Sequence, residues 1–84
     1  MFYVYVLRST SSGKYYIGQS ENPERRLEYH NTIEKGFTSR YRPWELVWKK
    51  RYETRVEAIK VERMVKSRKN RIYVEKLIRG EVSI

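Results

Sequence analysis

The chain has 84 residues, with 19 Lys and Arg against 10 Asp and Glu, and a formal net charge of +9. This length has room for one hydrophobic core and excludes a dinucleotide-binding domain with a second domain beside it. The absence of cysteine excludes disulfides, thiolate metal clusters and a cysteine nucleophile, and the single histidine excludes a site built from two imidazoles of one chain. We therefore predict one domain over residues 1–84.

The composition also limits the partners. Hydrophobic residues make up 39% and aromatic residues 14% of the chain, which favours a folded core over a disordered basic tail. No apolar run approaches the roughly 20 residues that span a bilayer, and the apolar start is too short for a secretory signal. We therefore expect a cytoplasmic protein without membrane contact. The positive excess alone indicates a polyanionic partner, which is DNA, RNA or an anionic membrane surface, and a highly soluble surface is the alternative explanation of the charge.

The first quarter of the chain predicts a β-hairpin. Residues 2–7 are rich in Tyr and Val, residues 10–13 carry turn-forming types, and residues 15–19 form a second strand-like run. The short turn is expected to bring Tyr5 and Tyr16 within about one residue of direct cross-strand register.

The middle of the chain predicts a helix, a loop and a strand. Asn22 is a typical N-cap, Pro23 suits the first helical position, and the helix is expected to run to about Ile33. Gly, Thr, Ser and basic residues over 35–42 predict a loop. The strand that follows is expected to turn one face into the core, with Trp44, Leu46 and Trp48.

Two helices are predicted for the last part of the chain. The sequence 54–57 fits a capping box, so a helix begins at Arg55. Asn70 caps a last helix that ends at Gly80. The buried arc of the first of these helices consists of Ala58, Val61 and Val65. The order of elements is ββαβαα, which predicts an α+β fold.

Several polar residues stand where the pattern expects apolar ones. Glu62 lies at the edge of the buried arc of its helix, where a carboxylate is costly unless it is paired or bound to a cation; a basic partner is the simpler explanation. Arg26 and His30 are four residues apart and share a helix face, which packing alone also explains. Gly18 interrupts a strand, which indicates the close approach of either a phosphate backbone or a side chain of the first helix.

Tyrosines are concentrated in the predicted hairpin. Most strand tyrosines are packing residues, but a phenol can act in catalysis if a cation or metal lowers its pKa from roughly 10. Tyrosines, an arginine, a histidine and a carboxylate in one place would suit phosphodiester hydrolysis, which needs a base, a positive charge and a metal ion.

The ordered set of motifs resembles the GIY-YIG nuclease superfamily. Tyr3-Val4-Tyr5 is followed, eleven residues after Tyr5, by Tyr16-Ile17-Gly18, then by residues 22–27 with His30, and then by Glu62 in a late helix. The sequences Arg-Pro-Trp-Glu-Leu-Val at 42–47 and Ala58-x-x-x-Glu62 are similar to the small stand-alone bacterial branch, the UPF0213 or YhbQ-like proteins. The resemblance implies a three-stranded antiparallel sheet flanked by helices and metal-dependent cleavage of DNA.

The resemblance also implies roles for five residues. Tyr5 and Tyr16 are the motif tyrosines, one of which would help to deprotonate the attacking water. Arg26 would stabilise charge on the scissile phosphate, and His30 would hydrogen-bond near the nucleophile. Glu62 would be the sole carboxylate ligand of a Mg²⁺ or Mn²⁺ ion.

The chain departs from the superfamily pattern in two places. Tyr3 replaces the glycine of the first motif, and Asn70 comes too early for the late asparagine of many members and is better explained as a helix cap.

We expect affinity for DNA to come from a protein partner or from basic residues of the chain. The basic residues expected to contact phosphates are Arg40, Arg42, Lys49, Lys50 and Arg51. Two alternatives stay open: a non-catalytic basic module that binds nucleic acid, and a nuclease subunit that is active only with a partner.

Overall fold

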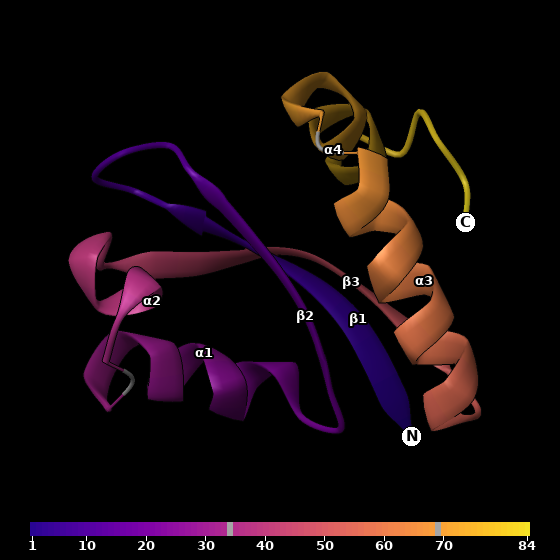
Figure 1. Cartoon of the computed structure of the whole chain (residues 1–84), viewed down its shortest axis with the longest axis horizontal. Coiled ribbons are helices and arrows are strands. Elements are labelled where there is room, and N and C mark those ends of the chain that lie inside the picture. The colour runs from indigo at the N-terminus through magenta and orange to yellow at the C-terminus, as the bar shows by residue number, and fades with distance from the viewer. Residues whose placement is uncertain (34, 69) are drawn as a thin grey trace.

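Three antiparallel strands in the order β2-β1-β3 form the centre of the fold (Figure 1). They are β1 (Phe2–Ser9), β2 (Tyr15–Ser20) and β3 (Trp44–Tyr52), and the computed structural model describes residues 1–33, 35–68 and 70–84. Four consecutive residues of β1, from Val4 to Leu7, are buried. A strand that is apolar on both faces is stable only between two neighbours and between two layers of helices, so β1 takes the central position.

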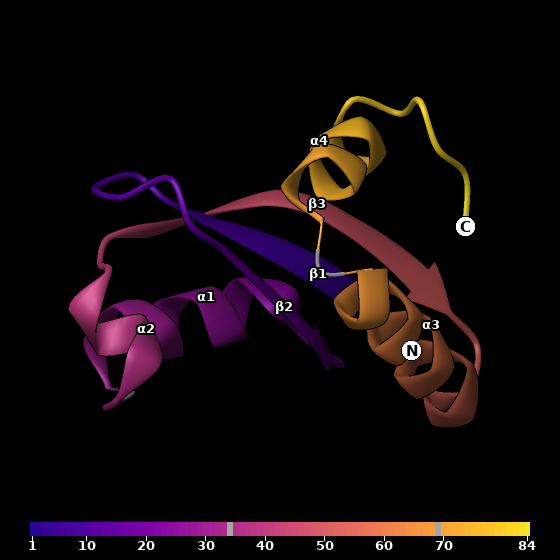
Figure 2. The ribbon, with the colours of Figure 1, turned by 45° about the horizontal axis from the view of Figure 1, so that its top comes forward.

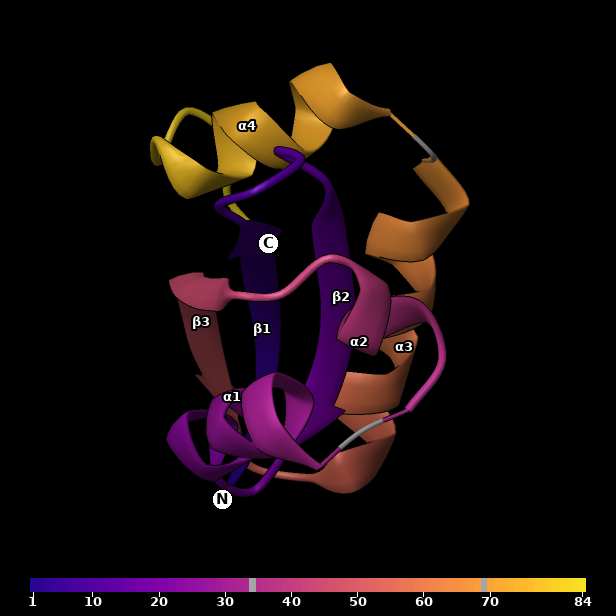
Figure 3. The ribbon, with the colours of Figure 1, turned by 90° about the vertical axis from the view of Figure 1, so that its left-hand side faces the viewer.

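Helices cover both faces of this sheet. Helices α1 (Pro23–Thr32) and α2 (Phe37–Arg40) lie against one face, and α3 (Arg55–Arg68) and α4 (Arg71–Ile78) lie against the other (Figures 2 and 3). This arrangement confirms the predicted α+β class and the three-stranded antiparallel sheet. Among the described residues, no helix combines the length and the apolar composition needed to cross a membrane.

Each face of the sheet has its own core. The face under α1 and α2 buries Tyr5, Leu7 and Trp44. The face under α3 and α4 buries Val6, Val65, Val74 and Leu77. Because successive side chains of β1 point to opposite faces, Tyr5 enters one core while its neighbour Val6 enters the other.

The starts of three helices agree with the sequence predictions. The Asn22 side chain accepts a hydrogen bond from the backbone N–H of Arg25 at 3.1 Å. Thr54 Oγ1 accepts one from the N–H of Glu57 at 3.2 Å, and α3 begins at Arg55. Asn70 caps α4 through the N–H of Ile72 at 2.8 Å. These caps are local hydrogen bonds, which sequence patterns describe well.

The segment 35–42 differs from the predicted loop because it contains the single-turn helix α2. The indole Nε1 of Trp44 donates a hydrogen bond to the carbonyl oxygen of Thr38 at 2.7 Å, and Thr38 is buried. This contact with the start of β3 holds the turn in place. The turn therefore depends on a residue outside the segment 35–42, and the sequence of the segment alone does not predict it.

Strand β3 also differs from the prediction. Its pairing with β1 shifts between Val6 and Leu7, so that Leu46 pairs with Leu7 but Trp48 pairs with Val6. A bulge of this kind moves the following side chains to the other face of the sheet. Trp44 and Leu46 therefore pack in the Tyr5 core, whereas Trp48 packs in the Val6 core, and the predicted common face is wrong for Trp48.

Candidate active site

The buried phenol of Tyr5 is the centre of the candidate site. Its side chain is 1% exposed, and its Oη lies 3.2 Å from Nε2 of His30, a buried residue of α1. The rings of Tyr16 and His30 are 4.7 Å apart between centroids. The hairpin and α1 thus bring together three of the residues that the sequence analysis selected.

The register of the hairpin differs slightly from the prediction. Tyr5 pairs directly with Gly18, and Tyr16 pairs with Leu7, so the two tyrosines are diagonal neighbours with ring centroids 6.5 Å apart. Gly18 is the residue over which the Tyr5 phenol lies. A Cβ atom at Gly18 would stand 2.6 Å from Tyr5 Oη and 2.7 Å from its Cζ. The close approach at Gly18 is therefore made by Tyr5 of the neighbouring strand, and not by a side chain of the first helix.

We expect Gly18→Ala to destabilise the fold by about 1–3 kcal/mol, because the added methyl group overlaps the Tyr5 ring. Displacement of that ring would also break the Tyr5–His30 hydrogen bond. Chemical denaturation of the single and double variants measures the effect. In a Tyr5→Leu background the same substitution should cost much less, and an equal cost in both backgrounds would contradict this explanation.

Burial raises the pKa of Tyr5 from 10.0 to about 12. A hydrogen bond with Arg26 lowers this pKa, but it is outweighed by burial and by the negative charges that Tyr16, when ionised, and Glu62 add nearby. A phenol with a lowered pKa was one possibility from the sequence, and the burial of Tyr5 shifts its pKa in the opposite direction. Tyr5 is therefore a neutral phenol at neutral pH and acts as a hydrogen-bonding group.

The raised pKa of Tyr5 predicts a loss of stability in alkali. Since the folded-state pKa lies above the unfolded one, the stabilisation is complete below about pH 10 and declines as the pH rises through 12, by about 2 to 3 kcal/mol in total. Denaturant titrations at pH 9 to 12 measure this decline. Tyr5→Phe should show a shallower decline than wild type, and Tyr3→Phe should keep the wild-type decline because Tyr5 is still present; equal slopes in all three proteins would count against the assignment.

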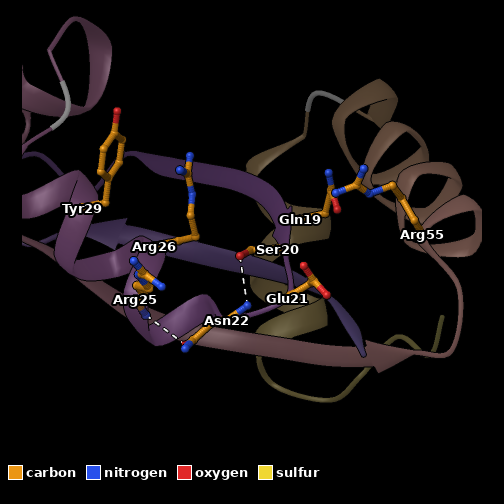
Figure 4. A pocket seen from close by; sticks show the side chains of 8 residues that line it. All are labelled: Gln19, Ser20, Glu21, Asn22, Arg25, Arg26, Tyr29 and Arg55. Carbon is orange, nitrogen blue, oxygen red and sulfur yellow. Dashed lines mark hydrogen bonds between the residues drawn. The ribbon is translucent and has the colours of Figure 1, made fainter.

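Arg26 stands at the edge of this cluster and lines a cavity. Its guanidinium lies 4.8 Å from the centroid of the Tyr29 ring, a cation–π contact within α1. The cavity has a volume of about 500 Å³, and we call it the β2–α1 pocket (Figure 4). Its lining residues are Gln19, Ser20, Glu21, Asn22, Arg25, Arg26, Tyr29 and Arg55. The pocket gives a ligand outside the protein access to Arg26.

Glu62 comes to the site from α3, on the other side of the sheet. Its carboxylate forms an ion pair with Lys66 at 3.2 Å, so the basic partner that the sequence analysis considered is present. The Glu62 side chain is 18% exposed, and its charge is one of those that raise the pKa of Tyr5. The charge of Glu62 therefore acts on the phenol from the opposite layer of the fold.

The donor chemistry of Glu62 fits a hard divalent cation. Within residues 1–33, 35–68 and 70–84, no three His, Cys, Asp or Glu side chains are grouped so that they could enclose a metal. Mg²⁺ keeps several water ligands and is commonly held by one or two carboxylates together with phosphate oxygens of a substrate. A single carboxylate such as that of Glu62 is consistent with that mode of binding.

The five basic residues expected to contact DNA do not form one surface. Arg40 lies at the end of α2, Arg42 Nε donates to the carbonyl oxygen of His30 at 2.7 Å, and Lys50 donates to the carbonyl oxygen of Ile84. Lys49 forms an ion pair with Glu24 at 2.6 Å, and Arg51 pairs with Tyr3 across the sheet. Lys49 and Arg51 lie on the same face of the sheet as Tyr5, whereas Lys50, which pairs with Val4, lies on the other face. Their contact with nucleic acid stays a prediction.

Three residues of the β2–α1 pocket with aromatic or cationic side chains were not predicted from the sequence: Arg25, Tyr29 and Arg55. Two spacing signals could have found them. Tyr29 stands three residues after Arg26, and Arg55 stands seven residues before Glu62, so each shares a helix face with a selected residue. Arg25 gives no such signal, because adjacent helical residues point in different directions.

Comparisons with known proteins agree with this fold. Residues 1–77 match the family model described as the GIY-YIG catalytic domain. The solution NMR structure of the UPF0213 protein BH0048 from Bacillus halodurans matches 93% of this chain and 83% of its own, with a TM-score of 0.57 and 27% identity.

Two curated relatives are similar over a shorter stretch. Both are named structure-specific endonuclease subunit SLX1. The protein from Podospora anserina is 49% identical over 53 residues, and the protein from Chaetomium globosum is 43% identical over 53 residues. Each match covers 56% of this chain but only 15% and 16% of the relative. The family match spans nearly the whole chain, and the chain therefore belongs to the GIY-YIG catalytic domain family of nucleases.

Proposed function

We propose that the protein is a divalent-metal-dependent endonuclease that hydrolyses phosphodiester bonds of DNA. One observation carries the proposal: a cation, Arg26, hydrogen-bonds to the buried phenol of Tyr5, and the charge of a carboxylate, Glu62, acts on the same phenol from the opposite layer of the fold. The core needs neither charge at this position, and the two charges together suit a reaction in which negative charge develops on a phosphate.

Each residue of the candidate site has its own proposed role in the hydrolysis. Arg26 borders the β2–α1 pocket, where its guanidinium can bind phosphate oxygens in a bidentate manner. His30 holds the Tyr5 hydroxyl, and Tyr16, whose ring lies against His30, is the less buried of the two motif tyrosines. This exposure and the raised pKa of Tyr5 favour Tyr16 as the group that contacts and deprotonates the attacking water. A Mg²⁺ or Mn²⁺ ion held by Glu62 would stabilise charge on the leaving oxygen.

The names of the curated relatives support the choice of substrate. The curated relatives are named as subunits of structure-specific endonucleases, and the chain spans about 15% of their length. We therefore propose branched, damaged or single-stranded DNA as substrate and a protein partner as a further source of affinity.

A nicking assay tests the proposal. Wild-type protein is incubated with supercoiled, branched and single-stranded DNA in the presence of Mg²⁺, Mn²⁺ or EDTA. Cleavage that needs the metal supports the proposal. Binding without cleavage on every substrate would favour the non-catalytic module instead, and cleavage in EDTA would contradict the metal requirement.

A further inference from the structure

The β2–α1 pocket extends well beyond Arg26. Figure 4 shows Arg25, Arg26 and Tyr29 of α1 on one side of the pocket and Arg55 of α3 on the other, beside Gln19. Arg55 is the first residue of α3, and its guanidinium lies 5.6 Å from the centroid of the Phe2 ring. This cation–π contact orders a side chain that would otherwise be free to move in solvent.

The pocket carries more positive than negative charge. Three guanidinium groups line it against one carboxylate, that of Glu21. Within the described ranges, neither Arg25 nor Arg55 forms an ion pair with a carboxylate. Cations gathered around a cavity repel one another, and an anion in the cavity removes that repulsion. The hydroxyl of Ser20 and the amides of Gln19 and Asn22 add neutral groups that can hydrogen-bond to such an anion.

The distance between Arg55 and Glu62 along α3 gives the length of DNA strand that would lie between them. The two residues are seven positions apart on α3, which is nearly two full turns, so they share one face of the helix about 10 Å apart along its axis. Successive phosphates of one DNA strand in the B form rise by about 3.4 Å. Because neighbouring phosphates also turn about the helix axis, they lie farther apart than this rise, and Arg55 lies about one to two nucleotides from a phosphate bound to a metal ion at Glu62.

We propose that the Arg55 end of the β2–α1 pocket binds a backbone phosphate that flanks the scissile phosphate on the same strand. This inference rests on the proposed function, because it takes the scissile phosphate to lie between Arg26 and Glu62. Arg55 is then a substrate-binding residue that fixes the path of the strand through the site. The ligand is a nucleic-acid phosphodiester, whose contact with arginine carries no sequence information.

The test compares Arg55→Ala with Arg63→Ala, which removes the same charge from an exposed position of the same helix outside the pocket. For cleavage of an oligonucleotide, we expect Arg55→Ala to raise KM about tenfold and to leave kcat within about twofold. The slope of log affinity against log salt should become shallower by about one. Arg63→Ala should stay within about twofold of wild type in every measurement. Arg55→Lys keeps the charge and should recover most of the affinity.

A second measurement uses strands in which one phosphate is replaced by an uncharged methylphosphonate. Wild type should lose affinity at one flanking position, and Arg55→Ala should show no further loss there, whereas Arg63→Ala should behave as wild type does. Equal losses in Arg55→Ala and wild type, or equal effects of Arg55→Ala and Arg63→Ala, would overturn the inference. These binding measurements need no cleavage. They therefore test the phosphate site even if the nicking assay shows no cleavage and thereby contradicts the proposed function.

Discussion

Glu62→Ala should reduce metal-dependent cleavage by about a thousandfold or more while the protein stays folded. A metal ion supplies several kcal/mol of transition-state stabilisation, and about 4 kcal/mol corresponds to three orders of magnitude in rate. The lost ion pair with Lys66 cannot explain such an effect, because i,i+4 pairs on a helix contribute only about 0.3–0.5 kcal/mol to stability.

Lys66→Ala is the matched control for this prediction. It removes the same ion pair but keeps the carboxylate, so cleavage should remain near the wild-type rate. Single-turnover rates in Mg²⁺ and thermal melting of the three proteins give the comparison. A Glu62→Ala protein that cuts within tenfold of wild type would show that the metal is held elsewhere or that a contaminating nuclease is present.

Arg26→Ala should lower kcat for cleavage by about 100- to 1,000-fold, the usual effect of removing one group that stabilises developing charge. The cost to stability should be below about 2 kcal/mol. The variant loses one cation–π contact with Tyr29 and one hydrogen bond with Tyr5, each of which contributes about 1 kcal/mol.

Steady-state kinetics together with thermal melting separate the two roles of Arg26. Arg26→Lys keeps the charge but loses bidentate binding, so its rate should lie between those of wild type and Arg26→Ala. Arg63→Ala again serves as the charge control. If Arg26→Ala unfolds at the assay temperature while Arg63→Ala does not, Arg26 is a structural residue.

Much of the fold could be predicted from local patterns. The three helix starts at Asn22, Thr54 and Asn70 were recognisable because a cap is a hydrogen bond between residues two or three positions apart. The hairpin and the central antiparallel sheet followed from runs of Tyr and Val around turn residues. The bulge that turns Trp48 away from Leu46 had no local signal, since it depends on how β3 pairs with β1.

The candidate site was only partly accessible from the sequence. The order of motifs selected Tyr5, Tyr16, Arg26, His30 and Glu62. The structure brings Tyr16, Arg26 and His30 to the phenol of Tyr5, on which the charge of Glu62 acts from the opposite layer. The direction in which the pKa of Tyr5 shifts could not be predicted from the sequence. It depends on how deeply the ring is buried, and that depth is set by Gly18 on the next strand and by His30 on α1.

The sequence by itself determined the strands, the helix starts, the excess of nine positive charges and the types of residue that could do chemistry. Only the tertiary structure decided where that charge can act. Arg42, Lys49 and Lys50 donate hydrogen bonds to oxygen atoms of the protein, whereas Arg25, Arg26 and Arg55 line one cavity. The physical reason is that local hydrogen bonds form between neighbours in the chain, while burial, pKa and a charged pocket arise from groups that are distant in sequence and meet only when the sheet packs against its helices.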